Sequence, residues 1–317
     1  MNRRISVALI VISAGFALLS SEALAQTRSL KDQTGGVTRG VSSIADFSGS
    51  WAHPSLYALE PPLSGPGPVR NKSRLRTGPQ AGAGNNGQLV GDYSNPILQP
   101  WAAEVVKKFG EISLAGKGFP TPRNQCWPEG MPFVFLAFGM QILQQSDKIT
   151  IIYPFDHQFR QVRMNQAHPS QVSPSWYGDS VGRYEGDELV IDTVGVKIGR
   201  YSMLDSFGTP YTERLHLVER YRLLDYEATK EAVERAAKEL VQVAVPDNGP
   251  RADPNYKGKG LQIELTVEDK GAFTMPWSAT VTFRRALDEW TELVCAENQQ
   301  WHPGTYSEVP IADKPDF

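Results

Sequence analysis

The stretch Trp176–Thr193, WYGDSVGRYEGDELVIDT, decides the fold class of this chain. Two extended runs flank the turn Glu185–Glu188, where Gly186 supplies the positive φ that a hairpin turn needs. The second run, Leu189–Ile191, is apolar on both faces and ends on Asp192. A carboxylate that closes a buried strand is either a hydrogen-bonded structural group or a working group in a pocket, and both readings stay open.

Alternating apolar and polar residues continue this β pattern from Lys148 onward. The alternating runs are Lys148–Tyr153, Glu213–Leu223, Leu261–Glu268, Ala279–Phe283 and Trp290–Cys295. Short strands without a βαβ rhythm predict a mainly β fold, either an antiparallel barrel of the lipocalin-like kind or a sandwich. We expect one β-rich domain over 26–317, with an N-terminal arm and short elements over 44–147 and barrel strands over 148–317.

Two helices are expected beside the strands. The Pro/Gly-rich tract Pro61–Pro100 cannot form a packed element and is expected to lie as an arm over the barrel. A helical stripe, made of Ile97, Trp101, Val105 and Phe109, follows over Pro96–Gly110. A second amphipathic helix, Tyr226–Leu240, belongs to an insertion over 225–260, which is either a lid over the barrel mouth or a surface decoration.

The N-terminus predicts export. Arg3 and Arg4 precede the apolar run Ile5–Leu19, and Ala23–Ala25 offers the small residues that signal peptidase reads. We expect a signal peptide over 1–25, a periplasmic or secreted protein and no membrane span in the mature chain; an uncleaved anchor is the alternative. A formal net charge of -3 and the lack of a basic block argue against a nucleic-acid partner.

The two cysteines, Cys126 and Cys295, predict a disulfide in an oxidising compartment, and two separate buried thiols are the alternative. The sequence has no HExxH and no paired Cys/His spacing, so no metal is expected. It also lacks a GxSxG elbow, a phosphate-binding glycine loop and a dinucleotide fingerprint. The chemistry is therefore expected to need no cofactor.

Strand parity and strand ends select the acid–base candidates. Glu219 lies on the apolar face of its strand, where an ionised carboxylate needs a partner such as Arg163 or a shifted pKa. His157 shares parity with Phe159 and is expected to point inward, and His168 precedes Pro169 at a strand end. The catalytic candidates are His157, His168, Asp192 and Glu219, and the substrate-binding candidates are Arg163, Tyr201, Glu213 and Trp277. Each also has an ordinary structural reading, as a surface, ion-pair or core residue.

Several motifs together resemble a large group of secreted bacterial proteins that share a GRWEGDTLVVDT motif. The matching segments are Asp46–Trp51, Cys126–Pro132, Asp156–His157, His168–Pro169, Gly182–Thr193, Thr212–Glu213, Glu219–Tyr221, Pro276–Trp277 and Cys295–Asn298. Tyr184 and Tyr211 stand where that group usually has Trp and His. The resemblance implies a secreted, lipocalin-like barrel and carries no particular reaction with it.

These observations predict an exported enzyme that performs elimination, hydration or hydrolysis on a small, partly apolar substrate in a barrel cavity. His157 or His168 would carry the proton, Asp192 or Glu219 would orient it, and Arg163 would hold the polar part of the substrate. Arg183 is a possible partner of Asp192. The alternatives are a non-catalytic barrel that binds a hydrophobic small molecule and an envelope protein with a filled core.

Overall fold

The computed structural model describes residues 44–72, 89–115, 117–137, 139–154, 158–239 and 251–287. All of them belong to one compact unit. The predicted signal peptide over 1–25 and the predicted strand Trp290–Cys295 lie outside the described residues, so both stay predictions.

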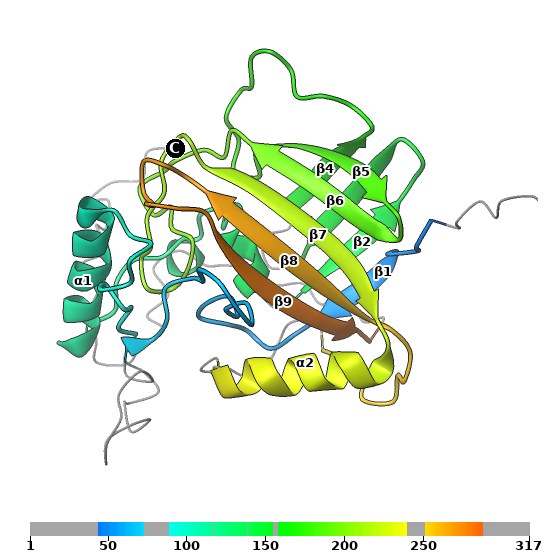
Figure 1. Ribbon diagram of the computed structural model, residues 1–317, viewed down its shortest axis with the longest axis horizontal. Helices are drawn as coiled ribbons and strands as arrows, with labels where there is room; N and C mark the ends of the chain where they lie inside the picture. The colour runs from blue at the N-terminus through cyan, green and yellow to red at the C-terminus, as the bar shows by residue number, and fades with distance from the viewer. Residues whose placement is uncertain are drawn as a thin grey trace, which may run out of the picture. The chain divides into compact units, whose positions relative to one another are not determined.

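Nine strands of the described chain close into a barrel (Figure 1). They are β1 (Gly49–Ala52), β2 (Gly139–Gln144), β3 (Lys148–Tyr153), β4 (Gln158–Met164), β5 (Asp179–Glu185), β6 (Glu188–Val194), β7 (His216–Leu224), β8 (Gly260–Glu268) and β9 (Trp277–Arg285). Each strand pairs with the next, and β1 closes the ring where Trp51 pairs with Arg285. The mainly β barrel is confirmed, and the sandwich alternative falls away.

The hairpin β5–β6 forms as the sequence predicts. Glu185 pairs with Glu188 across the turn, and Gly186 has a φ of 67°. Ile191 and Thr193 of β6 are fully buried on the lumen side. Val190 is also fully buried although it faces outward, because its register partners are Arg183 and Arg220, whose long stems can cover it.

Two features of the barrel differ from expectation. The barrel begins before Lys148, because β1 and β2 supply two of its strands. One pair, β4–β5, is parallel, while every other strand pair of the described barrel is antiparallel. The segment 165–178 between these strands is long enough to cross over and return in the same direction, which a tight turn cannot do.

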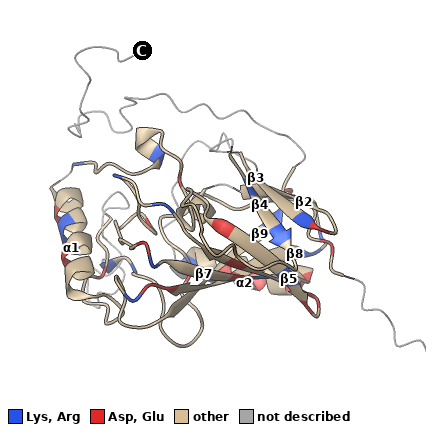
Figure 2. Cartoon of the chain, turned by 90° about the horizontal axis from the view of Figure 1, so that it is seen from above, with Lys and Arg blue, Asp and Glu red and all other residues tan. Residues whose placement is uncertain are grey.

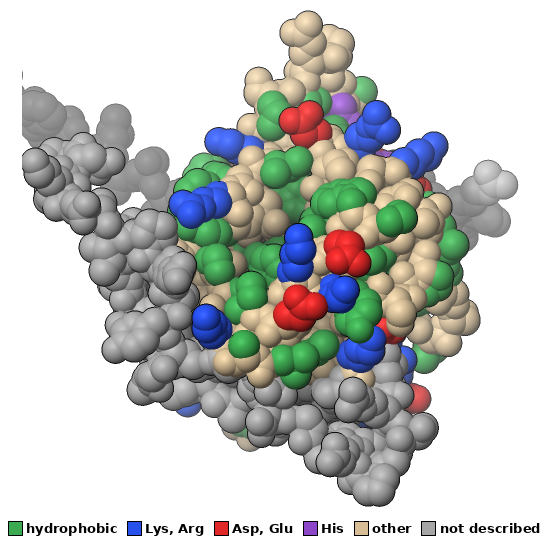
Figure 3. Space-filling view, turned by 90° about the vertical axis from the view of Figure 1, so that its left-hand side faces the viewer, with side chains coloured by type: hydrophobic (Ala, Val, Ile, Leu, Met, Phe, Trp, Pro, Cys, Tyr) green, Lys and Arg blue, Asp and Glu red, His purple; other side chains and the backbone are tan. Residues whose placement is uncertain are grey.

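The helix α1 (Pro100–Leu114) starts at a proline, which fits the first turn of a helix. Its buried residues are Ala102, Val106, Gly110 and Ser113, one position beyond the predicted stripe. Trp101 is 45 % exposed, and its Nε1 donates a hydrogen bond to the Gly271 carbonyl at 2.7 Å. On the face that carries α1, basic, acidic and apolar side chains are interspersed (Figure 3).

The helix α2 (Tyr226–Glu239) confirms the second helix and lies against β8 and β9 (Figure 1). Arg235 Nε donates to Glu60 Oε1 at 2.6 Å, and the Glu60 carboxylate is buried. Since Glu60 also pairs with Thr280 of β9, this bond ties α2 to the barrel wall. Because this bond fixes α2 to the wall, it favours the interpretation of the insertion as a surface decoration over that of a lid on the barrel mouth. None of the helices in the described residues is long and apolar enough to cross a membrane.

Candidate functional site

Two histidines share the carboxylate of Asp192 on the outer face of the barrel. His216, the first residue of β7, places Nε2 3.1 Å from each oxygen of Asp192. His168, in the segment between β4 and β5, places Nε2 3.0 Å from Asp192 Oδ1. Asp192 faces away from the lumen because its neighbours Ile191 and Thr193 are the residues that fill it.

A second carboxylate, Asp179 of β5, extends this cluster toward β4. Asp179 Oδ1 lies 2.6 Å from His168 Nδ1. Arg163 donates from Nη1 and Nη2 to the two oxygens of Asp179 at 2.6 and 2.9 Å. The cluster therefore alternates in charge across four neighbouring strands, in the order Arg163, Asp179, His168, Asp192 and His216, and we call it the outer cluster.

These hydrogen bonds set the protonation of the outer cluster. The hydrogen bond from His216 lowers the pKa of Asp192, against the opposing effect of burial, and His168 lowers it further. The same bond to Asp192 raises the pKa of His216. Arg163 is the main cause that lowers the pKa of Asp179. At neutral pH both carboxylates are therefore ionised, and His216 keeps its proton to a higher pH than a free histidine does.

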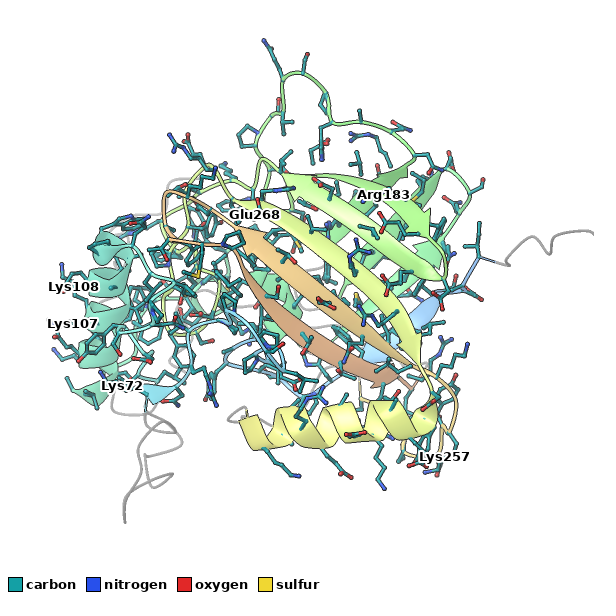
Figure 4. All side chains as sticks on the ribbon, in the orientation of Figure 1. Lys72, Lys107, Lys108, Arg183, Lys257 and Glu268 are labelled. Carbon is teal, nitrogen blue, oxygen red and sulfur yellow. The ribbon has the colours of Figure 1, made fainter. Side chains whose placement is uncertain are left out.

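The two histidines differ in which ring nitrogens are free to react. Both nitrogens of His168 face carboxylate oxygens, and only a doubly protonated ring donates at both. His216 uses Nε2 for Asp192, while its Nδ1 lies 3.7 Å from Glu268 Oε2, beyond hydrogen-bond distance. Glu268 ends β8, is half exposed and is labelled in Figure 4. Nδ1 of His216 is thus the ring nitrogen that a bound molecule can reach.

Valines line the barrel wall around the outer cluster. Val181 and Val218 are the register partners of Asp192, and Val194 is that of Asp179. All three are partly exposed and share the outward parity of these carboxylates. A molecule that contacts His216 would therefore meet apolar surface next to the charged groups.

Glu219 belongs to a different network inside the barrel. Its two oxygens accept hydrogen bonds from Arg160 Nη1 and Nη2 at 2.9 and 2.7 Å, and the Tyr221 hydroxyl donates to it at 2.9 Å. Arg160 Nε donates to Ser180 Oγ at 2.8 Å. Arg160 and Glu219 are 2 % and 0 % exposed. Burial also raises the pKa of Tyr153, which lies in this network, to about 12.

This lumen network corrects two expectations. The buried ion pair of Glu219 exists, but its partner is Arg160 and not Arg163, because Arg160, Val162 and Met164 are the inward residues of β4. The opposite face of β4 carries Phe159, which is 61 % exposed, so the parity that His157 shares with it points outward. His157 itself lies outside the described residues.

The other predicted residues lie apart from both networks. Glu213 precedes β7 and is exposed, because the strand starts only at His216. Trp277 is 2 % exposed and packs edge-to-face on Phe273, as a core residue does. Tyr201 lies in a surface aromatic group, with its ring 5.4 Å from that of Trp127. Arg183 pairs with Glu185 and not with Asp192.

Three important residues escaped the sequence analysis. His216 was not among the candidates, because it shares the outward parity of the polar residues of its strand, and that face carries the outer cluster. Asp179 received no attention because it only begins a strand, and Arg160 was read as an outward residue through the inverted parity of β4. The register of β6 against β7 places Val218 opposite Asp192 and His216 diagonally beside it, but these strands are far apart in sequence and no local signal predicts their pairing.

The predicted Cys126–Cys295 disulfide ends on a residue outside the described ranges and stays a prediction. Within those ranges, no group of three or more His, Cys, Asp and Glu side chains has the arrangement of a metal site. No family model matches the chain, and no curated protein or solved structure is significantly similar to it.

Proposed function

We propose that this chain is an exported enzyme that needs no cofactor and performs acid–base chemistry on a small, partly apolar substrate at the outer cluster. One observation carries the proposal. His216 Nε2 is held 3.1 Å from both oxygens of Asp192, while its Nδ1 lies 3.7 Å from the half-exposed Glu268 carboxylate, beyond hydrogen-bond distance. A carboxylate that orients one ring nitrogen while the other is free is the arrangement that a general base uses.

The proposed chemistry is proton transfer at His216 Nδ1. In the neutral ring, Nε2 keeps its proton and donates it to Asp192, so Nδ1 has a lone pair that can accept a proton from water or from substrate. Asp192 then stabilises the resulting imidazolium. Return of that proton to a leaving group or an adjacent carbon completes hydrolysis, hydration or elimination, and no electron carrier is needed.

We assign His168 and Arg163 to positioning in this proposal. His168 is bonded to two carboxylates and holds Asp192 from the side opposite His216. Both guanidinium nitrogens of Arg163 face Asp179, so its role is to fix that carboxylate. The valines beside Asp192 and Asp179 support the partly apolar nature of the substrate.

The test is turnover of a substrate panel. Small esters, lactones, α,β-unsaturated acids and β-substituted ketones are incubated with the purified protein, and products are detected as a gain or loss of water by mass spectrometry. For any substrate that reacts, we expect His216→Gln and Asp192→Asn each to reduce kcat by about 100- to 10,000-fold. His168→Gln should reduce kcat less and displace the pH profile, since it acts through Asp192.

Arg183→Ala is the matched control, because Arg183 lies on the same outer wall, pairs only with Glu185 in the described contacts and is half exposed (Figure 4). It should keep full turnover. If His216→Gln turns over the substrate as the parent protein does, the assignment of His216 fails.

A non-catalytic binding role is the second candidate, and the surface aromatic group favours it. Trp127 packs edge-to-face on both Trp176 and Tyr201, at 5.6 and 5.4 Å between ring centroids. Lys197 Nζ lies 5.0 Å from the Trp176 ring centroid, and such a mixed surface can hold a planar ligand. Saturable binding of a panel compound that Trp127→Ala abolishes, without turnover of any panel compound, would favour this role.

We further propose that the protein acts outside the cytoplasm with Cys126 and Cys295 joined. The support is the N-terminal signal pattern and the presence of only two cysteines. Mass spectrometry of the protein recovered from the periplasm or medium should show an N-terminus at Gln26 and, without reductant, a cross-linked Cys126–Cys295 peptide. An intact N-terminus or two alkylatable thiols would contradict the respective part of this proposal.

A further inference from the structure

A cavity of about 240 Å³ lies between α2 and the barrel, far from the outer cluster. One wall is the first two turns of α2, a second is the segment 256–260 that leads into β8, and the third is the end of β9. The cavity adjoins Gly260, the first residue of β8, whereas Glu268 at the outer cluster is the last. A strand of this length separates its two ends by about 26 Å, so the two sites are distinct.

The lining of this cavity is strongly basic in an acidic chain. Lys230, Lys259, Arg284 and Arg285 line it, and Glu234 is the one acidic residue among the described residues of the lining. The whole chain carries a formal net charge of -3. Figure 2 shows the basic residues where β9 ends. A concave surface lined by one sign of charge concentrates the opposite ion.

Backbone carbonyls hold the two arginines in place. Arg284 Nη2 donates to the Asp253 carbonyl at 3.1 Å, and Arg285 Nη1 donates to the Ser48 carbonyl at 2.8 Å. The Arg285 guanidinium also lies 5.3 Å from the Trp51 ring centroid. Carbonyls and rings carry no net charge, so these contacts fix both guanidinium groups without neutralising them.

Carboxylates compensate this charge only in part within the described chain. None of the ion pairs among the described residues involves Lys259, Arg284 or Arg285, and the charge of Arg285 contributes to lowering the pKa of Asp46 without a direct ion pair. Lys230 lies 4.0 Å from Glu234, but both side chains are more than half exposed, so this pair is weak. At least three cations of the described chain therefore line the cavity without a strong ion pair and can bind an anion.

Tyrosines give the cavity an apolar side. Tyr226, Tyr256 and Val233 all line it. Lys257 Nζ donates to the Tyr226 hydroxyl at 2.8 Å and adds a fifth cation beside the N-terminal end of α2 (Figure 4). The volume is at the small end of ligand pockets, which suits a compact molecule.

We propose that this cavity binds a small organic oxyanion, with a phosphate or carboxylate group against Arg284 and Lys259 and a planar apolar body against the tyrosines. Arginine matches the paired oxygens of phosphate and carboxylate with two parallel N–H groups. A free small molecule and a lipid headgroup could both present such an oxyanion, and the vesicle measurement below distinguishes them.

Calorimetric titration of the full-length protein with phenyl phosphate, inorganic phosphate and benzoate tests this proposal. Phenyl phosphate should bind with one-to-one stoichiometry and more tightly than inorganic phosphate, and added salt should weaken both. The double variant Lys259→Gln, Arg284→Gln should bind phenyl phosphate at least about tenfold more weakly. Lys108→Gln on α1, an exposed lysine outside the cavity (Figure 4), should change the affinity by less than about twofold.

Two further variants address misfolding and the independence of this site from the outer cluster. If the double variant does not fold by circular dichroism, Lys259→Gln alone serves, since Lys259 makes no ion pair in the described structure. His216→Gln should bind phenyl phosphate like the parent protein, so failure of the proposed enzyme would leave this site standing. The proposal would be overturned if phenyl phosphate did not bind, whether or not phosphatidylglycerol vesicles did. It would also be overturned if Lys108→Gln lost as much affinity for phenyl phosphate as the double variant.

Discussion

The lumen network and the outer cluster use the same kinds of side chain on opposite faces of the same two strands. Glu219 and Val218 are neighbours in sequence, and so are Asp192 and Thr193, yet each pair divides between the two faces. In the lumen, Arg160 and Glu219 side chains are 1 % and 0 % exposed. Outside, Asp192 and His216 are 26 % and 33 % exposed. Access to solvent, and not residue type, separates a structural ion pair from a group that can exchange protons.

The bonding of the two regions supports this contrast. Glu219 is fully engaged by Arg160 and Tyr221, and Arg160 is further bonded to Ser180 and Thr193. Nothing in such a network can move a proton to a ligand without leaving a buried charge. In the outer cluster His216 is partly exposed, and its Nδ1 has only the half-exposed Glu268 carboxylate near it among the described residues, at 3.7 Å. The predictions below test this contrast, beginning with the largest expected effect.

Removing the lumen cation should be the most damaging change. Arg160→Ala leaves the Glu219 carboxylate buried without a counter-charge, and we expect the free energy of unfolding to fall by about 3–5 kcal/mol. Arg163→Ala, on the outward face of the same strand, should cost about 0–1 kcal/mol, because Arg163 is partly exposed and Asp179 keeps His168 as a second partner. Urea unfolding measures both, and equal losses would refute the contrast.

Replacing both members of the lumen pair sharpens the same comparison. Arg160→Met with Glu219→Leu removes both charges, and its stability should lie well above that of Arg160→Ala, although Tyr221 loses its acceptor. A double variant as unstable as the single one would show that the network contributes more than charge compensation.

The ion pair between Arg235 of α2 and Glu60 at the barrel wall is less buried than the lumen pair and more buried than a surface pair. Glu60 is buried and Arg235 is about one-third exposed, so Arg235→Ala should cost about 1–3 kcal/mol, with Thr280 Oγ1 remaining as a donor at 3.2 Å. Lys230→Ala removes a 4.0 Å pair on the same helix whose members are exposed, and it should have almost no effect in thermal unfolding. A larger loss for Lys230→Ala would contradict the dependence on burial.

The pH dependence of stability should report the outer cluster, with a change of about 1 kcal/mol or less. Asp192 and Asp179 have lowered pKa values, so their contribution is present above about pH 4 and is lost as the pH falls through the folded values. His216 has a raised pKa, so its contribution is complete below about pH 6.5 and is lost as the pH rises through the folded value. In a plot of the free energy of unfolding against pH, Asp192→Asn should reduce the change on both the acidic and the basic side. Gln161→Ala should leave this plot unchanged.

The sequence was sufficient for a mainly β fold, but not for the choice between barrel and sandwich, because period-2 alternation is a local signal. It predicted β3, β7, β8 and β9 and the turn at Gly186. It did not predict that β1 and β2 join the barrel or that β4 and β5 are parallel, because pairing between distant segments leaves no local trace. The parity of β4 was inverted because Arg160 is a charged residue that faces inward, and only its partner Glu219 on another strand makes that position favourable.

The candidate site was predicted in part for the same reason. His168 oriented by Asp192 was one of the pairings that the sequence suggested, and the structure places these two side chains 3.0 Å apart. The choice of Glu219 rested on its buried face, and a buried face cannot distinguish a paired carboxylate from a reactive one. His216 was passed over because an outward histidine looks ordinary until the register places Asp192 beside it.

A histidine titration by NMR tests the central contrast most directly. The ring signals of His216 are followed from pH 4 to 9 in the parent protein and in Asp192→Asn, with assignment from the loss of one set of signals in His216→Gln. We predict an apparent pKa above 6.5 in the parent protein and a return toward that value in Asp192→Asn, because the Asp192 carboxylate is the main cause of the shift. A His216 ring that titrates identically in both proteins would contradict the assignment of this pair as the proton-exchanging group.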